Sequence, residues 1–268
     1  MPPPVKTAAC ALGIPVYQPD RFVRERIRVL DAYPADVYVV AAFGKVLRPS
    51  VLGRPRLGCV NVHASLLPRW RGASPVTAAV LAGDAVSGVT TMLMDPGLDT
   101  GAILMQKEIP LSPDETGGSL EDKLSALGAE LILPTLAGLE DGSIVPRPQE
   151  GESTYVGLLE KEMGEIDFSL SAAVVERMVR AYDPWPGTFT FLRGKLLKIR
   201  KAAVLSGTAD MRPGTVIRAD KSGFDVQTGD GILRILTLQP EGKKSMDAAA
   251  FLRGASVKAG EMLGRQEK

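Results

Sequence analysis

The 268-residue sequence predicts an α/β protein in which a parallel-sheet, Rossmann-like domain is followed by a small β-barrel. Three observations support this prediction. In the first half, apolar strand-like runs alternate with stretches that have the apolar spacing of helices. A polar segment then interrupts the chain, and short strand-like pieces separated by turn residues follow it. Because 45% of the residues are hydrophobic, there are enough apolar side chains to form a core.

The strand-like runs of the first part are rich in valine and alanine. ADVYVVAAF at 35–43 is almost continuously apolar, which favours a strand buried on both faces. GCVNVHA at 58–64 and GVTTMLMD at 88–95 have the same character. In a right-handed βαβ arrangement, ligands bind beyond the carboxyl ends of the strands. We therefore expect the loops that follow the second and third runs, which contain NVHASLLP and MDPGLDTG, to meet at that edge.

Three stretches have the pattern of helices. SPVTAAVLAG at 74–83 offers Ser74 as an N-cap, followed by a proline at the first helical position. The longer stretch at 119–139 begins with Ser119 and carries an aspartate three residues later, which resembles a capping box. LSAAVVERMVRAY at 170–182 predicts a third helix, after the polar segment.

Composition and charge exclude several classes of protein. The chain has no run of 18 uncharged apolar residues, and MPPPVKTAAC is unlike a signal peptide. Cys10 and Cys59 are isolated, so neither a disulfide framework nor a zinc site is indicated. We expect a cytoplasmic protein without a membrane role. Of the 32 basic and 31 acidic residues, 18 and 15 lie in 151–268, which weakly favours an anionic partner for that part.

His63, the only histidine in the chain, lies in the strand predicted at 58–64. Side chains two positions apart share one face of a strand, so Asn61 and His63 point the same way. An imidazole exchanges a proton near pH 7 and an amide donates a hydrogen bond to an oxyanion, a combination that suits acyl transfer to an amine. A lone histidine in a buried strand also commonly hydrogen-bonds a backbone carbonyl, so the strand alone leaves both interpretations open.

The loop MDPGLDTGA at 94–102 is a second candidate for chemistry. Its glycines permit tight turns that could bring Asp99 back toward His63. Taken alone, an Asp-Pro-Gly stretch is also typical of an ordinary turn. A calcium loop is not indicated, because the alternating oxygen ligands and the closing glutamate are absent.

Four motifs make the sequence similar to the folate-dependent formyltransferases over nearly its whole length: AAFGKVLRPSVL at 41–52, GCVNVHASLLPRWRGASPV at 58–76, GVTTMLMDPGLDTGAIL at 88–104 and YDPWPGTF at 182–189. The resemblance implies a catalytic formyltransferase domain over 1–141, a linker at 142–160 and an OB-like, tRNA-binding barrel over 161–268. It further implies transfer of a formyl group from 10-formyltetrahydrofolate to the amino group of methionine on initiator tRNA, without a metal.

By the same resemblance, Asn61, His63 and Asp99 form the catalytic trio. Asn61 would hold the formyl oxygen as the carbon becomes tetrahedral, His63 would handle the amine proton or support the oxyanion, and Asp99 would orient His63. Which of His63 and Asp99 is the base stays open. A flat reduced pterin suits a pocket of apolar side chains and loop backbone. The residues implied for that pocket are Phe43, Gly44, Lys45, Val46, Leu47, Ser65, Leu66, Leu67, Pro68, Asp95 and Gly97.

Basic residues in both parts are candidates for contact with tRNA: Arg69, Arg71, Arg193, Lys195, Lys198 and Arg200. Guanidinium groups pair bidentately with phosphates, and LRGKLLKIRK at 192–201 would give the barrel a positive face. Solvated arginines and an edge strand protected by lysines explain the same residues. The resemblance favours tRNA contact, and we expect the protein to act as a monomer. Trp185, between two prolines, is expected to pack on the barrel or on the preceding helix.

Members of this family normally begin with further strands and a helix before the position that matches Pro4. The resemblance therefore predicts a sheet whose remaining strands expose unpaired backbone and apolar faces. A misassigned start and a true truncation are competing explanations, and the intact motifs favour the first. Alternative functions are formylation of a sugar-nucleotide amine, hydrolysis of formyl-folate, and tRNA binding without catalysis.

Overall fold

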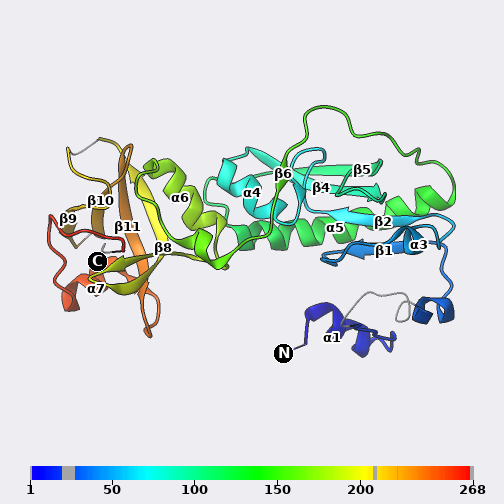
Figure 1. Ribbon diagram of the computed structural model, residues 1–268, viewed down its shortest axis with the longest axis horizontal. Coiled ribbons are helices and arrows are strands. Elements are labelled where there is room, and N and C mark those ends of the chain that lie inside the picture. Colours follow the sequence, from blue (N-terminus) through cyan, green and yellow to red (C-terminus); the bar gives the residue numbers. More distant parts are fainter. Residues whose placement is uncertain (1, 20–27, 208–209, 222, 266–268) are drawn as a thin grey trace.

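The computed structural model describes residues 2–19, 28–207, 210–221 and 223–265. Figure 1 shows two lobes along the long axis of the molecule, an α/β lobe at one end and a β-rich lobe at the other, with helix α6 between them. None of the helices in these ranges is both long and apolar enough to cross a membrane. The minor elements are α1 (Pro4–Ala11), η1 (Arg28–Ala32), α3 (Pro49–Leu52), η2 (Lys161–Gly164) and α7 (Ala248–Gly254).

A four-stranded sheet forms the centre of the α/β lobe. Its strands, in the spatial order β1-β2-β4-β5, are Tyr38–Ala41, Cys59–His63, Val86–Leu93 and Ile103–Pro110. The first two strands pair in parallel, as expected, whereas β4 is antiparallel to both β2 and β5. The expectation that the run at 88–95 continues the parallel alternation is therefore wrong. Nearly every residue of β4 is buried. A strand that is buried on both faces is apolar in either direction, so its sequence pattern does not show whether it runs parallel or antiparallel.

Strand β1 is an edge of this sheet. Only alternate residues of the strand are shielded, and the Val39 side chain is 47% exposed. The prediction that 35–43 is buried on both faces is wrong for this reason: among the described residues, only β2 pairs with β1.

Helix α5 (Gly117–Glu140) packs its leucines, among them Leu120 and Leu124, against the sheet (Figure 1). A capping box is present, but it starts earlier than predicted. Thr116 is the N-cap and Ser119 is the N3 residue that bonds back to it, so Ser119 is not the cap. Helix α4 (Pro75–Ala82) follows Ser74 as predicted, although the Ser74 side chain makes no capping hydrogen bond.

The segment 142–160 runs along the α/β lobe. Arg147 pairs with Ile103 at the start of β5, and β6 (Tyr155–Val156) pairs in parallel with β3 (Arg71–Gly72). The connection between the lobes therefore pairs with strands of the α/β lobe and lies beside the loop that follows His63. The division of the chain at 141 and 160 stays a prediction.

The second lobe is a small barrel, which confirms the predicted architecture. Its main sheet has the order β7-β8-β11-β10-β9, with bounds Thr188–Leu192, Lys195–Leu205, Ile232–Pro240, Gly223–Gln227 and Val216–Asp220, and β12 (Met246–Asp247) pairs with β11. Near the end of the chain, Leu263 bridges to Leu192 and Met262 bridges to Thr215. These bridges join the two edge strands, so that side chains such as Phe224 and Ile235 are completely enclosed.

Helix α6 (Ala172–Ala181) joins the lobes by contributing to both cores. Val175 and Val179 belong to the barrel core, whereas Met178 packs with α4 and α5 of the other lobe. Arg177 also donates a 2.9 Å hydrogen bond to the carbonyl of Leu81 at the end of α4. Trp185 does not pack as expected: it is 56% exposed in the turn after α6.

Candidate functional site

Strand β2 carries two polar side chains, Asn61 and His63, at its carboxyl end. His63 is only 6% exposed, and its Nε2 lies 2.9 Å from the carbonyl oxygen of Trp70. A carbonyl oxygen only accepts, so Nε2 carries the hydrogen. The backbone hydrogen bond expected of a histidine in a buried strand is therefore present at Nε2. Nδ1 makes no such bond to any described residue and is available for proton transfer.

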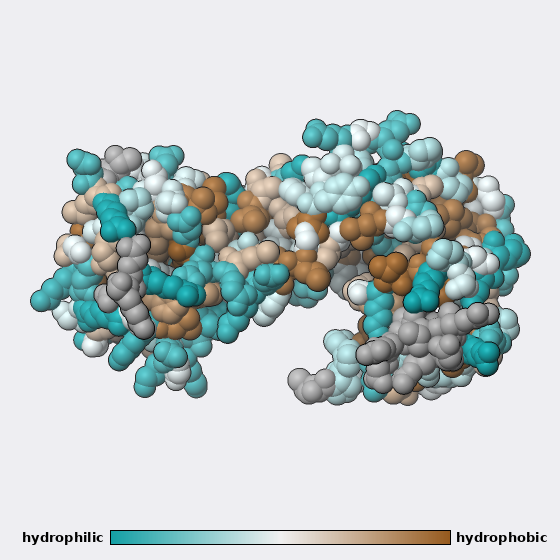
Figure 2. Space-filling view, viewed as in Figure 1, coloured by the Kyte–Doolittle hydropathy of each residue, from teal (hydrophilic) through white to brown (hydrophobic). Residues whose placement is uncertain are grey.

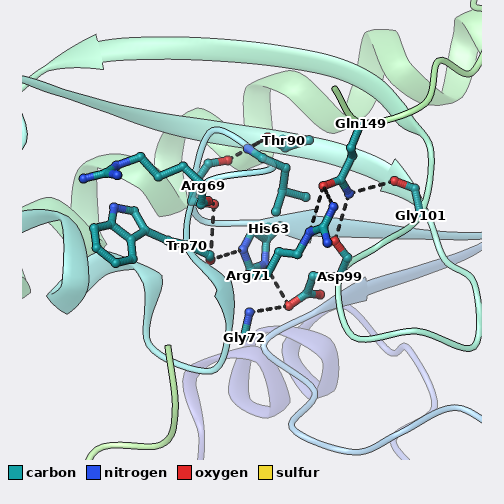
Figure 3. Close-up of polar contacts among 11 residues, drawn as sticks. His63, Arg69, Trp70, Arg71, Gly72, Thr90, Asp99, Gly101 and Gln149 are labelled. Atoms are coloured by element: carbon teal, nitrogen blue, oxygen red, sulfur yellow. Dashed lines mark hydrogen bonds and ion pairs between the residues drawn. The ribbon is translucent and has the colours of Figure 1, made fainter. Parts of the chain in front are cut away.

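Asp99 faces that second nitrogen. Its Oδ2 lies 3.8 Å from His63 Nδ1 and accepts a 2.8 Å hydrogen bond from the backbone N–H of Gly72 (Figure 3). The Asp99 side chain is 13% exposed, so the pair is largely shielded from water. The structure thus brings together the imidazole and the carboxylate that the sequence singled out.

The route by which Asp99 arrives differs from the expected one. Because β4 is antiparallel to β2, its loop leaves the sheet near Cys59, where the N–H of Met94 donates to the Cys59 carbonyl. The loop then turns back toward the other end of β2, with Asp99 in the left-handed region at φ 53°. The two loops therefore do not leave the same edge of a parallel sheet. Asp99 reaches His63 because its loop folds back.

Asn61 lies one pleat before His63 and is partly buried. Among the described residues, none hydrogen-bonds to the Asn61 side chain, so its amide is available to a substrate. An amide donor, an imidazole nitrogen and a carboxylate at one strand end can hold a developing oxyanion and accept a proton. These are the requirements of acyl transfer to an amine.

The turn that follows His63 is held from inside the protein. Thr90 donates to the Ser65 carbonyl at 2.6 Å and accepts from the Leu67 N–H at 3.1 Å. Ser65 is buried and donates to the Arg69 carbonyl, while Leu67 packs with Met92 and Ile103. Of the four turn residues expected in the pterin pocket, only Leu66 and Pro68 are partly exposed.

The other residues expected in that pocket lie on two surface segments. The segment 43–47 follows the carboxyl end of β1, which pairs in parallel beside β2, and it presents Phe43 and Val46 at 40% and 81% exposure. Gly44 and Lys45 are also exposed, whereas Leu47 is buried against Val51. In the loop of Asp99, the Asp95 carboxylate accepts from the Gly97 N–H and from Thr100, and so fixes the turn.

Arg69 and Arg71, expected at tRNA phosphates, are both engaged within the protein. Arg69 forms two hydrogen bonds to the Asp84 carboxylate, which help to raise its pKa, and its guanidinium lies over the Trp70 ring. Arg71 donates twice to the Gln149 side chain and once to the Tyr155 hydroxyl. Figure 3 shows that the side chains of both arginines extend away from His63.

The four basic residues expected to contact tRNA from the barrel differ in their partners. Arg193 is paired with Glu261, and Arg200 donates to Gln239 and lies 3.6 Å from the Asp183 carboxylate. Lys195 and Lys198 make no ion pair within the described ranges. Of these four residues, Lys195 is exposed and Lys198 is partly exposed on β8.

Gln149 and Gly72 are not among the site residues predicted from the sequence. Gly72 has φ 106°, and a Cβ there would lie 2.2 Å from the carbonyl oxygen of Val156, so only glycine fits between β3 and β6. Gln149 lies in the segment predicted to be a linker, where a polar residue gives no signal of a role. Within the described ranges, no cluster of three histidine, cysteine, aspartate or glutamate side chains could hold a metal ion.

Comparison with known proteins identifies the family. A family model described as formyl transferase matches residues 3–136, and one described as formyl transferase, C-terminal domain, matches residues 158–256. The methionyl-tRNA formyltransferase of Lachnospira eligens is 50% identical over 268 residues, covering 97% of this chain and 85% of that protein. The enzyme of the same name from Agathobacter rectalis is 46% identical, covering 96% and 84%.

Solved structures share the fold at lower identity. WlaRD, a sugar 3N-formyl transferase, is 18% identical with a TM-score of 0.65, covering 90% of this chain and 82% of that one. Methionyl-tRNA formyltransferase from Clostridium thermocellum is 19% identical with a TM-score of 0.54, covering 72% and 82%. HypX from Aquifex aeolicus, solved with tetrahydrofolic acid, is 20% identical with a TM-score of 0.62, covering 84% of this chain, which spans only 40% of HypX. The chain belongs to the formyl transferase family.

Proposed function

We propose that this protein transfers the formyl group of 10-formyltetrahydrofolate to the amino group of methionyl-initiator tRNA. The observation that carries the proposal is the grouping of Asn61, His63 and Asp99 at one end of β2, in a chain 50% identical to a methionyl-tRNA formyltransferase. Because tRNA and reduced folates are solutes of the cytoplasm, the proposal places the protein there.

Each residue of the trio has a distinct part in this reaction. The amine nitrogen bonds to the formyl carbon, the bond from that carbon to the folate nitrogen breaks, the amine loses a proton, and the departing folate nitrogen gains one. Asn61 donates a hydrogen bond to the formyl oxygen while it carries negative charge. The pair of His63 Nδ1 and Asp99 accepts the proton, since Nε2 is already committed to the Trp70 carbonyl.

The surroundings of the trio fit a reduced folate. A pterin is flat, with hydrogen-bonding groups along its edge, and needs apolar contact area beside free backbone groups. Phe43 and Val46 are exposed apolar side chains just beyond β1, and residues 95–98 of the second loop are exposed. We therefore place the folate between these two segments, with Ser65 and Leu67 shaping the turn from inside.

For tRNA, we propose the outer face of β8. Lys198 is partly exposed on a strand whose neighbours Leu197 and Ile199 point into the barrel core, and Lys195 is exposed at its start. Cations that have no ion-pair partner among the described residues can neutralise phosphates. Since Arg69, Arg71 and Arg193 already have partners, we expect them to contribute less.

A competition assay tests the proposal. The protein is incubated with 10-formyltetrahydrofolate and equal amounts of methionyl-initiator tRNA and a dTDP-linked amino sugar, and the products are identified by mass spectrometry. We expect formyl-methionine on the tRNA. Formylated sugar alone, or free formate alone, would reject the proposal in favour of the other two formyl chemistries. Salt-sensitive tRNA binding without folate binding would favour a binding protein.

A further inference from the structure

We propose that Gln149 is a positioning residue for the catalytic pair, acting through the backbone of the Asp99 loop. The inference deepens the proposed function and rests on it, because it takes Asp99 and His63 as the reacting pair. Gln149 itself touches neither His63 nor the expected place of the substrate.

The side-chain amide of Gln149 bridges the two sides of the Asp99 turn. Its Nε2 donates to the carbonyl oxygen of Asp99 at 2.8 Å and to that of Gly101 at 2.9 Å (Figure 3). One side chain thus uses both of its N–H groups to hold the carbonyls on either side of Thr100. The position of the Asp99 backbone is set from outside its own loop.

Asp99 needs such support. Its φ of 53° lies in the left-handed region, which costs free energy for a residue with a side chain and persists only where the surroundings hold it. Its loop is otherwise exposed from Asp95 to Leu98. An external hydrogen-bond donor is therefore well placed to keep the carboxylate facing His63.

Arg71 fixes the orientation of the Gln149 amide. Its Nε and Nη2 both donate to Gln149 Oε1, at 3.0 and 2.7 Å, and a guanidinium can only donate. The amide nitrogen must then face the two carbonyls. Tyr155 adds a third restraint by accepting from Arg71 Nη1 at 2.8 Å.

The contacts close into a ring. Gly72, the next residue after Arg71, donates its N–H to the Asp99 carboxylate, while Arg71 reaches the Asp99 carbonyl through Gln149. The carboxylate and the backbone carbonyl of Asp99 are thus both held by residues of the two-residue strand β3, the carboxylate directly and the carbonyl through Gln149. This arrangement gives Arg71 a structural task, which differs from the phosphate contact expected from the sequence.

Substitutions of Gln149 test the proposal kinetically. Gln149→Leu removes both donors at similar size, and Gln149→Glu keeps the acceptor for Arg71 but loses the donors. We expect both variants to lower kcat about 10- to 100-fold, as small misplacements of reacting groups do, with the KM for tRNA changed less than about 2-fold. Arg71→Met should act through the same contacts. The reductions in kcat caused by Arg71→Met and by Gln149→Leu should therefore not add in the double variant.

A spectroscopic measurement separates positioning from general destabilisation. His63 is the only histidine, so the imidazole signals in a ¹H–¹⁵N spectrum report this site without assignment. We expect Gln149→Leu and Gln149→Glu to shift these signals in folded protein. Gln239→Leu is the matched control, because Gln239 also joins an arginine to a backbone carbonyl, but in the barrel. It should leave the imidazole signals unchanged.

The outcomes are distinct. Unchanged imidazole signals and a kcat within about 2-fold of the unsubstituted protein, in either variant, would overturn the proposal. If Arg71→Met lowers tRNA affinity and its salt dependence while kcat is unchanged, Arg71 contacts tRNA phosphates. This result would also overturn the proposal. If the unsubstituted protein formylates no tRNA, the proposed function fails, whereas the imidazole signals still decide whether Gln149 positions the pair.

Discussion

His63 illustrates how a single residue can serve structure and chemistry together. Its Nε2 is tied to the Trp70 carbonyl, which fixes the ring, and its Nδ1 faces the Asp99 carboxylate. The imidazole and the carboxylate therefore face each other in a site that is largely shielded from water. The ring is oriented before any substrate binds.

Asn61 provides a prediction at the residue scale. Asn61→Ala removes the amide that we place on the formyl oxygen, without breaking any hydrogen bond to another described residue. We expect kcat to fall about 10²- to 10³-fold, as for loss of one oxyanion donor, with little change in thermal stability. Steady-state kinetics and a melting curve check this. A large loss of stability with kcat intact would contradict the assignment.

At the scale of elements, the N-terminus of α5 depends on a cap that the structure places at Thr116. Its hydroxyl accepts from the Ser119 N–H at 3.1 Å, and Ser119 bonds back to the Thr116 N–H at 3.0 Å. We expect Thr116→Ala to lower the free energy of unfolding by about 0.5–2 kcal/mol in urea titrations. Ser74→Ala, at the start of α4, is the control and should cost less, because Ser74 makes no cap bond. Equal losses would argue against the assigned caps.

Glu115, next to that cap, predicts how stability responds to acid. Burial raises the pKa of its carboxyl, but hydrogen bonds from Lys123, Ser119 and the Ser112 N–H outweigh burial and leave the pKa below the usual 4.5. A folded-state pKa below the unfolded one gives stability that is present above pH 4.5 and is lost as the pH falls through the folded-state pKa.

Glu115→Gln tests this pH dependence. At pH 7 we expect the variant to be less stable by about 1–3 kcal/mol, because a hydrogen-bonded charge is lost. The difference should shrink as the pH falls from 4.5 through the lower folded-state pKa of Glu115. Denaturant titrations at several pH values measure it, with the exposed Glu121→Gln as control. A difference that is constant with pH would contradict the role of ionised Glu115.

The elements themselves could largely be predicted from the sequence, because apolar runs and helical spacing mark where strands and helices lie. The direction of β4 could not, since a strand buried on both faces has no polar side to orient it. Gln149 could not be found either. Its role depends on hydrogen bonds to a loop 50 residues away in the sequence, and its own segment is polar and irregular. The approach of Asp99 to His63 was predicted, although by a different route.

At the scale of the whole molecule, two lobes are held together by a helix that belongs to both cores. Val179 packs into the barrel while Met178, its neighbour in sequence, packs into the α/β lobe. Figure 2 shows apolar side chains over the middle of the molecule, between the two lobes. The shared helix would therefore orient the tRNA face that we propose on the barrel relative to the α/β lobe.

The proposed tRNA face predicts a change in salt dependence. Lys198→Ala should weaken tRNA binding and reduce the slope of log affinity against log salt by about 1, because one phosphate contact is lost. Lys107→Ala is the control, since Lys107 lies on the α/β lobe and is paired with Glu130. Fluorescence titrations at several salt concentrations measure both. An equal change in slope for the two variants would place the tRNA elsewhere.

The central claim is that the Asn61, His63 and Asp99 site formylates methionyl-tRNA. Its most direct test is the rate at which the protein and its His63→Ala variant form formyl-methionine on initiator tRNA from 10-formyltetrahydrofolate. We predict product from the unsubstituted protein, a kcat about 10²- to 10⁴-fold lower for His63→Ala, and equal tRNA affinity for both. Equal rates of formylation by the two proteins, or no formyl-methionine from the unsubstituted protein, would contradict the claim.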